Sequence, residues 1–271
     1  EVLSNGLCSL QEGQPRLVKS VFIRFDAKGR PVGSRFANAV IQSHKRLTYG
    51  QATMILEGRT GGFPRKVVET LRALEQLTRT IQKRRFSQGM LTLDLPEVEL
   101  ALDEKGNVAG ARPADTSFSH TLIEMCMVEA NEAVARLFAG MNVPCLRRIH
   151  PEPSADIGGK LAQYVRVMRF KLPAKPTRED LRALLEATRG TPEAFAVHLA
   201  ILRCFEQAVY SPKNIGHFAL ASEDYCHFTS PIRRYPDLTV HRLLDLHVQG
   251  KLASKKDRRA VRSRADLTEL G

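Results

Sequence analysis

The sequence predicts an α+β protein, and two kinds of hydrophobic pattern indicate this class. Apolar and polar residues alternate within residues 16–43, and strand-like runs recur within residues 89–102, as expected for strands with one buried face. Apolar residues recur every three or four positions within residues 66–85 and in most of the chain after residue 117, as expected for amphipathic helices. Strands concentrated early and helices concentrated late are typical of the α+β class.

The first predicted element is a β-hairpin. Its first strand is residues 16–26, in which Leu17, Val21, Ile23 and Phe25 share one face. The turn is Asp26-Ala27-Lys28-Gly29, and residues 31–43 are expected to return as the second strand. A further pair of strands is expected within residues 89–102, interrupted by Pro96 and followed by a turn at 103–106.

Helices are expected along most of the remaining chain. One opens at Arg46-Leu47-Thr48-Tyr49, and others cover residues 66–85, 117–141, 157–168, 177–188 and 191–208. Residues 117–141 form the strongest helix, whose predicted apolar stripe is Ile123, Met127, Ala130, Val134, Leu137 and Phe138. Glu124 and Asn131 are seven residues apart, so they lie on one edge of that stripe. The basic end of helix 66–85, Lys83-Arg84-Arg85, is expected to offset the helix dipole, with RNA contact as the alternative.

Charge and cysteine usage limit the partners and the compartment. The chain has 271 residues and a net charge of +12, with a pI of about 9.8, which favours a polyanionic partner, nucleic acid before membrane. No apolar run approaches the ~18 residues of a membrane span. The five cysteines are scattered without a CxxC pair. This argues against a zinc site or a disulfide framework, and we expect a cytoplasmic protein.

The stretch from Tyr225 to Arg242 is the densest in chemically useful groups. Ser230-Pro231 predicts a helix start, which places Arg233 and Arg234 in a first turn where an anion is already favoured. Guanidinium groups bind phosphate through two hydrogen bonds, so the pair suits a phosphodiester. Pro236 predicts a kink, or a restart capped by Asp237. The alternative is a capped surface helix with two solvated arginines.

A metal site is a second interpretation of the same stretch. Asp237, His241 and Asp245 are spaced i, i+4, i+8 and can line one helix face, where His227 could join them as a ligand. Aspartate–histidine pairs at this spacing also serve as helix-stabilising contacts.

Two blocks of the sequence carry a resemblance. One is Tyr225-Cys226-His227-Phe228-Thr229-Ser230-Pro231-Ile232-Arg233-Arg234-Tyr235-Pro236-Asp237-Leu238, and the other is the upstream block from Ala208 to Leu220. Together they closely resemble the signature of the ribonuclease II/ribonuclease R family. The resemblance covers nearly the whole chain but only the later two-thirds or so of the family's catalytic (RNB) domain. It implies that an antiparallel sheet is packed by the long helical array in one incomplete RNB-like domain over residues 1–271. The family's oligonucleotide-binding barrels are not expected in this chain.

The resemblance also implies site residues. Arg233 and Glu124 are the expected catalytic residues, because residues 122–135 resemble the family helix that carries a glutamate into the active site. The expected RNA-binding residues are Tyr49, Arg234, Tyr210 and His217. Asp237 and His241 are expected to orient the arginine turn. Two positions depart from the family: Met125 replaces a frequent second glutamate, and Leu93 replaces a phenylalanine that stacks on bases, although leucine has no π face.

The implied activity is 3′→5′ exoribonucleolytic hydrolysis of single-stranded RNA, releasing nucleoside 5′-monophosphates with magnesium as cofactor. The family's magnesium ligands belong to an aspartate-rich motif upstream of the matching segment, whereas the aspartates of this chain are dispersed. We therefore expect no metal ligands here, no turnover by this chain alone, and a partner segment that bears the aspartates, in the same gene product or a companion chain. The alternative is an RNA-binding or regulatory chain without nuclease activity.

Overall fold

The computed structural model describes residues 2–96, 98–103, 105–252 and 262–269 and confirms the α+β class. Within these residues the strands form three separate two-stranded antiparallel ribbons. The ribbons are β1 (Pro15–Phe25) with β2 (Pro31–Gln42), β3 (Val98–Leu102) with β4 (Val108–Pro113), and β5 (Arg147–Ile149) with β6 (Val209–Ser211). The helices are α1 (Tyr49–Leu56), α2 (Arg65–Ser87), α3 (Phe118–Gly140), α4 (Ala155–Val167), α5 (Arg178–Thr188), α6 (Ala194–Cys204), α7 (Tyr235–Val248) and α8 (Arg264–Thr268), with a π-helical turn at Val2–Leu7.

The β1–β2 hairpin forms as predicted. The Asp26 carboxylate accepts hydrogen bonds from the backbone N–H groups of Lys28 and Arg30, both at 2.9 Å, which closes the turn. Gly29 lies in the left-handed region (φ +71°), and a Cβ there would come within 3.0 Å of Thr80 Cγ2 on α2. The turn therefore needs glycine both for its backbone conformation and for close packing of the hairpin tip against α2.

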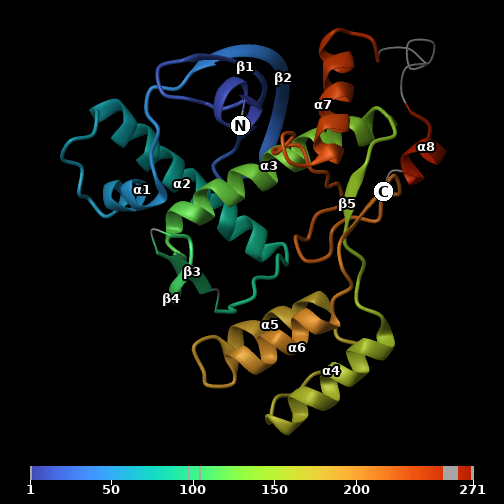
Figure 1. Cartoon of the computed structure of the whole chain (residues 1–271). Helices are drawn as coiled ribbons and strands as arrows, with labels where there is room; N and C mark the ends of the chain where they lie inside the picture. The colour runs from blue at the N-terminus through green and yellow to red at the C-terminus, as the bar shows by residue number, and fades with distance from the viewer. Residues whose placement is uncertain (1, 97, 104, 253–261, 270–271) are drawn as a thin grey trace.

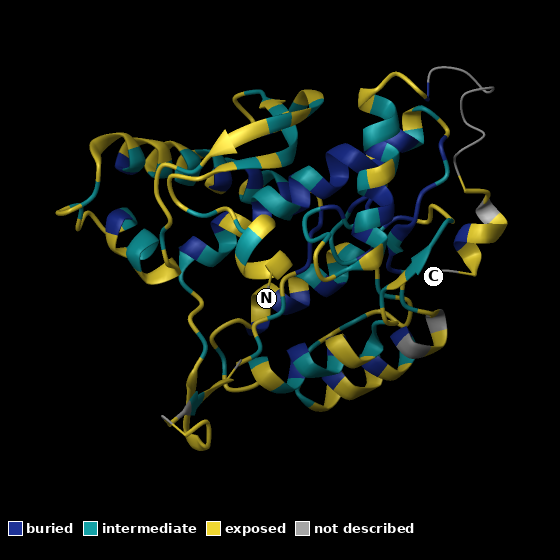
Figure 2. Ribbon diagram, turned by 45° about the horizontal axis from the view of Figure 1, so that its top comes forward, coloured by how far each residue is buried: buried dark blue, intermediate teal, exposed yellow. Residues whose placement is uncertain are grey.

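Helix α3 runs through the middle of the molecule and joins two hydrophobic cores (Figures 1 and 2). Its C-terminal half packs Val134 and Phe138 against Phe228 and against Val240 of α7. Its N-terminal half places Met125 in a smaller core with Ile81 of α2. Helices α4, α5 and α6 form a third core, which lies below α3 in Figure 1. In the sequence these three helices come between β5 and β6. Within the part of the chain that the structure describes, no helix is long and apolar enough to cross a bilayer.

Two of the three basic residues at the end of α2 are buried, which corrects the interpretation that their charges only offset the dipole or reach RNA; the third, Lys83, is exposed. Arg84 and Arg85 are 8% and 3% exposed and pair with carboxylates of α3. Arg85 Nη2 lies 2.6 Å from Glu129 and 2.8 Å from Glu132. Burial opposes the charge of Arg85, but these two carboxylates outweigh it and raise its pKa.

The predicted apolar stripe of α3 is only partly correct. Val134 and Phe138 are fully buried, but Ile123 is 41% exposed, while Glu129 and Glu132 are buried at 3%. Helix α2 lies along one side of α3, and the segment before α7 lies along another. Polar residues of α3 are buried on these sides because side-chain or backbone groups of α2 and of that segment form hydrogen bonds or ion pairs with them.

The predicted helix start at Ser230-Pro231 is wrong. Residues 231–233 form a turn, and α7 begins at Tyr235, with Arg234 at the N-cap and Pro236 in the first turn. Asp237 does not cap this helix. Instead its buried carboxylate accepts a hydrogen bond from Ser230 N at 2.8 Å. Proline lacks an N–H and fits only the first turn of a helix, so Pro236 fixes the start just ahead of itself.

One other predicted element also differs. Residues 90–96 form no strand, because their backbone is bonded elsewhere: Leu91 N donates to Ala219 O at 2.9 Å, and Asp94 N donates to His198 Nδ1 at 2.7 Å. The basic stretch 255–259, for which the sequence predicts a surface helix with RNA contact as the alternative, lies outside the described residues.

Replacing Arg85 by alanine should lower the free energy of unfolding by ~3 kcal/mol, the low end for a broken buried ion pair. Two buried carboxylates would each lose one of their two arginine partners, since Glu129 keeps Arg84 and Glu132 keeps Arg136. Urea denaturation followed by circular dichroism measures this loss. The matched control is Arg65→Ala, which breaks an exposed pair with Glu69 whose arginine is 91% exposed and should cost less than ~0.5 kcal/mol. Equal losses in the two variants would contradict a structural role for the buried cluster.

Candidate functional site

One face of α3 forms the floor of a cavity of about 830 Å³, which we call the α3 cavity. His120, Glu124 and Asn131 lie along this floor, and residues 92–95 form a facing wall. The deep end is closed by the segment before α7, through Tyr225, His227 and Arg234. Because Glu124 and Asn131 both line the cavity, the prediction that they share one edge of the helix is confirmed.

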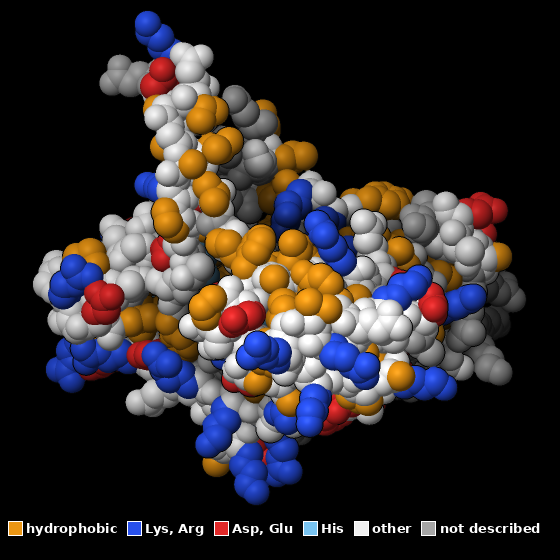
Figure 3. Space-filling model, turned by 90° about the horizontal axis from the view of Figure 1, so that it is seen from below, with side chains coloured by type: hydrophobic (Ala, Val, Ile, Leu, Met, Phe, Trp, Pro, Cys, Tyr) orange, Lys and Arg blue, Asp and Glu red, His pale blue; other side chains and the backbone are white. Residues whose placement is uncertain are grey.

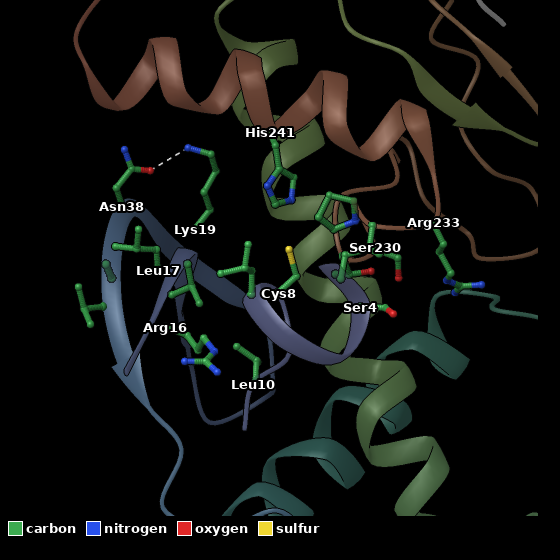
Figure 4. Close-up of a pocket in the computed structure, with 17 residues that line it drawn as sticks. Ser4, Cys8, Leu10, Arg16, Leu17, Lys19, Asn38, Ser230, Arg233 and His241 are labelled. Atoms are coloured by element: carbon green, nitrogen blue, oxygen red, sulfur yellow. Dashed lines mark hydrogen bonds between the residues drawn. The ribbon is translucent and has the colours of Figure 1, made fainter. Parts of the chain in front are cut away.

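Three of the predicted site residues line the α3 cavity together: Tyr49, Glu124 and Arg234. Leu93 is there too, so the departure from an aromatic residue falls inside the cavity. Arg233 lines a neighbouring cavity of about 1150 Å³ between the β1–β2 hairpin and the turn at 231–233 (Figure 4). Arg233 and Arg234 therefore line two adjacent cavities rather than one.

The two arginines also differ in how they are held. Arg234 Nη2 donates to Asp237 Oδ1 at 2.8 Å, and Asp237 is fully buried. Arg233 is exposed, and its guanidinium has no hydrogen bond or ion pair with any residue in the described ranges. Arg234 is thus fixed in place by its carboxylate, whereas Arg233 has its full set of donors available for an anion.

Asp237 and His241 were both expected to orient the arginine turn, but they contact different groups: Asp237 binds an arginine, and His241 binds the backbone. Asp237 holds Arg234 directly, as expected. His241 contacts the preceding segment instead: its Nε2 lies 2.8 Å from Phe228 O, and its ring stacks on Phe228 with centroids 4.5 Å apart.

The alternative metal site is contradicted by these partners. Asp237 and His241 are engaged as above, and Asp245 binds Lys19 at 2.7 Å and Asn38 at 3.0 Å, away from both. In the described part of the chain, no three His, Cys, Asp or Glu side chains are grouped to hold a metal ion. Asp94 and Asp115 line the α3 cavity with Glu124 without forming such a group. These residues therefore do not fit the magnesium site that the resemblance implies.

Tyr210 and His217 reach the α3 cavity only through other rings. The Tyr210 hydroxyl lies 2.8 Å from His227 Nδ1, and it is His227 that lines the cavity. His217 lines a separate hollow of about 990 Å³ and packs edge-on against Tyr225, with centroids 5.3 Å apart. Both predicted residues thus support the rings that form the deep end of the cavity.

Asn131 connects α3 to the signature segment and was missed as a functional residue. Its Nδ2 donates to the Tyr225 hydroxyl at 3.0 Å, and its Oδ1 accepts from Phe228 N at 2.9 Å. His120 was also missed, although it stands one helical turn before Glu124, and this spacing could have placed it on the same face.

The imidazoles of His227 and His217 are neutral at pH 7, because burial lowers their pKa. The pKa of His227 is lowered to about 4, first by burial and then by the charge of Arg234. That of His217 is lowered to about 3, first by burial and then by the charge of His150. Displacement of water raises the pKa of Glu124, and Arg85 opposes this rise. The positive charge offered to a ligand thus comes from arginine rather than histidine.

Comparison with known proteins places these features in a family. Residues 1–250 match the RNB domain family. Ribonuclease R of Aquifex aeolicus is 38% identical over 256 residues, which are 93% of this chain and 36% of that protein. Ribonuclease R of Escherichia coli is 37% identical over 250 residues, 90% of this chain and 30% of that protein. The chain thus spans about a third of the length of these relatives.

A solved structure is similar over almost the entire chain. Mycoplasma genitalium RNase R, in complex with ribose methylated single-stranded RNA, superposes with a TM-score of 0.91 and 31% sequence identity. The match covers 99% of this chain and 42% of that one. The matched part of the chain therefore includes the helices and segments that line the α3 cavity and its neighbour.

Acid should destabilise the fold through His217 and His227. Their pKa values are below the ordinary value of 6.5, so the unfolded chain binds more protons than the folded one below that pH, and the free energy of unfolding falls as the pH drops from about 6.5 towards 4. His217→Gln should flatten this dependence, measured by urea denaturation across that range. The control His44→Gln, at an exposed histidine, should keep the wild-type slope; an unchanged slope in His217→Gln would contradict the assignment.

Proposed function

The chain belongs to the RNB domain family, and on this premise we propose that it supplies the RNA-binding and arginine-bearing part of a 3′→5′ exoribonuclease. The proposed reaction is hydrolysis of single-stranded RNA to nucleoside 5′-monophosphates. The observation that carries this proposal is the pair of adjacent cavities around the 231–234 turn, with an anchored arginine on one and an unpaired arginine on the other.

The shape of the α3 cavity suits a single strand. Its floor runs from His120 to Asn131, a distance of about 16 Å at the helical rise of 1.5 Å per residue. Successive stacked bases are about 3.4 Å apart, so several nucleotides fit along it. The walls carry rings with neutral hydrogen-bonding atoms, and rings of this kind stack on unpaired bases. Lys and Arg side chains are scattered over the face drawn in Figure 3, among hydrophobic and fewer acidic side chains. The net charge of +12 favours a partner with a phosphate backbone.

Arg233 is the residue that we assign to the reacting phosphate. It is exposed and unpaired within the described residues, so both of its forked N–H donors can bind a phosphodiester. A guanidinium there offsets the charge that develops on the phosphate during attack. Arg234, held by Asp237, binds the next phosphate. Glu124, on the cavity floor, lies near the terminal nucleotide.

We propose that magnesium-binding aspartates come from a segment outside these 271 residues, in the same polypeptide or a companion chain. The described residues do not group ligands for a metal ion, whereas the proposed reaction in this family depends on one. This chain alone then binds RNA without cleaving it. All five cysteines are free thiols, which suits a protein that works in the reducing cytoplasm.

The same observation favours a second candidate function. A chain with an RNA cavity but without grouped metal ligands can act as an RNA-binding or regulatory protein with no nuclease activity. Reconstitution with an aspartate-bearing segment of a relative separates the two functions, because only the first predicts that the combination releases mononucleotides.

The first test is RNA binding by the chain as it stands. Contact with ~3 phosphates predicts that the affinity for a single-stranded oligonucleotide falls about tenfold from about 50 to about 150 mM KCl, since bound counterions are released. Fluorescence anisotropy measures this change. Arg65→Ala, an exposed variant outside both cavities, should leave the salt dependence unaltered. An affinity that salt does not change would contradict binding through phosphates.

The second test concerns Arg233 in the protein that includes the aspartate segment. Arg233→Ala should lower kcat by ~100–1,000-fold, while the Kd for RNA changes far less, because the contact strengthens only in the transition state. Arg233→Lys should recover part of kcat, since an ammonium lacks the bidentate fork. Arg242→Ala, at an exposed arginine of α7 outside both cavities, is the control. An intact kcat with a weakened Kd would show that Arg233 only positions RNA.

A further inference from the structure

His227 lines the deep end of the α3 cavity, and no step of the proposed reaction uses it. The ring is half-buried, and its Nδ1 lies 2.8 Å from the hydroxyl of Tyr210. Its second nitrogen, Nε2, has no hydrogen-bond partner within the residues that the structure describes. One nitrogen is thus held by the protein, and the other is left for a ligand in the cavity.

Tyr210 is itself held by a cation. In the β5–β6 ribbon Arg148 stands directly opposite Tyr210, and the guanidinium carbon of Arg148 lies 4.8 Å from the centre of the Tyr210 ring. The backbone N–H of Arg148 donates to Tyr225 O at 3.1 Å, which ties the ribbon to the segment that carries His227. In the described ranges the Arg148 guanidinium has no carboxylate partner, so its attraction to the ring face is unopposed.

The hydrogen bond between Tyr210 and His227 determines which imidazole nitrogen carries the proton. Burial raises the pKa of Tyr210, so the hydroxyl is protonated at pH 7, and neutral His227 carries one N–H. If the hydroxyl donates to Nδ1, both groups are satisfied and the imidazole proton lies on Nε2. If Nδ1 were the donor, the hydroxyl proton would have no acceptor among the described residues, which is costly for a partly buried group. The charge of Arg148 over the ring also makes the hydroxyl a better donor.

An anchored arginine lies beside the free nitrogen. Arg234 lines the same end of the cavity, where Asp237 holds it at 2.8 Å. Its charge is the second cause, after burial, of the lowered pKa of His227, as expected for two neighbouring groups. A phosphodiester has two free oxygens, so one that binds the Arg234 guanidinium can also accept a hydrogen bond from an adjacent N–H.

We propose that His227 donates its Nε2–H to the backbone phosphate that Arg234 holds, and that Tyr210 and Arg148 are positioning residues that select this tautomer. The proposal rests on the proposed RNA-binding function, to which it adds a neutral donor and the group that this donor binds. Because the imidazole carries no charge, its contact should strengthen binding without releasing a counterion, whereas an arginine contact releases one.

The first test separates the two kinds of contact by their response to salt. His227→Ala should weaken binding of a single-stranded oligonucleotide about tenfold at every KCl concentration, so that its plot of log Kd against log [KCl] is parallel to that of the wild type. Arg234→Ala should also reduce the slope, by about 0.7 for one phosphate contact with a single strand. His44→Ala, at an exposed histidine outside both cavities, is the control and should bind as the wild type does.

Two conservative variants separate the donor from the ring. His227→Gln can place an amide N–H near the position of Nε2, so it should recover most of the affinity. His227→Asn reaches only the position of Nδ1, so it should bind as weakly as His227→Ala. Equal affinities of the glutamine and asparagine variants would contradict a contact through Nε2.

Modified oligonucleotides identify the group that His227 binds. In one series a single methylphosphonate replaces each linkage near the 3′ end in turn, and in another a single 2′-deoxynucleotide replaces each ribonucleotide. At one methylphosphonate position His227→Ala should lose less affinity than the wild type does, because one contact to that phosphate is already gone. Coupling to a 2′-deoxy position instead would overturn the assignment to phosphate.

Nitrogen-15 NMR of the imidazoles tests the tautomer in the free chain. The wild type should show His227 protonated on Nε2, and Tyr210→Phe and Arg148→Ala should both raise the population protonated on Nδ1. A purely structural role of Tyr210 would leave this population unchanged. A wild-type proton on Nδ1 overturns the proposal, and so does RNA binding of normal salt dependence that His227→Ala leaves intact. If the wild-type chain binds no RNA, the proposed function itself fails first.

Discussion

Helix α3 is buried along most of its length, and its buried polar side chains must therefore find partners. Glu129 and Glu132 meet Arg85 of α2, and Asn131, between them, bonds Tyr225 and the backbone of Phe228. A buried carboxylate without a partner is strongly unfavourable, so these contacts fix α2 on one side of α3 and the signature segment on another. The space left between the two is the α3 cavity.

The same constraint determines the charges that a ligand meets. The deep end of the cavity is packed with rings, and burial keeps His227 and His217 neutral. Asp237 is buried under Arg234 and holds it, whereas Arg233 emerges from the same turn without a partner among the described residues. A phosphate at this turn therefore meets one rigid and one available guanidinium, next to walls that suit bases and sugars rather than further charge.

Periodicity in the sequence predicted most of the helices, because they bury one face. It also predicted the β1–β2 hairpin from the alternation of apolar and polar residues, although Leu17 is 88% exposed. It failed where tertiary contacts decide. The stripe of α3 was misplaced because Glu129 and Glu132 are buried by ion pairs, which no hydrophobic pattern reveals. The sequence placed the start of α7 at Ser230, because a serine followed by proline is a frequent cap. In the structure Ser230 N donates a hydrogen bond to Asp237 and lies in a separate turn before α7.

The candidate site was predicted in part. The family resemblance supplied Tyr49, Glu124 and Arg234, which line one cavity, and Arg233, which lines the next. His120 was not found, because its pairing with Tyr49 joins two helices more than 60 residues apart in the chain. Contacts of that kind depend on how helices pack, and spacing along one helix cannot predict them.

The central claim is that single-stranded RNA lies along α3. Photo-crosslinking of oligonucleotides carrying 4-thiouridine near the 3′ end, with the crosslinked peptides identified by mass spectrometry, tests it most directly. The account predicts crosslinks to residues 49, 92–95 and 116–131 along the α3 cavity, and to the segment 225–234, which lines both this cavity and its neighbour. Crosslinks concentrated on the exposed side of α2 or on α4–α6, with none in these ranges, would contradict it.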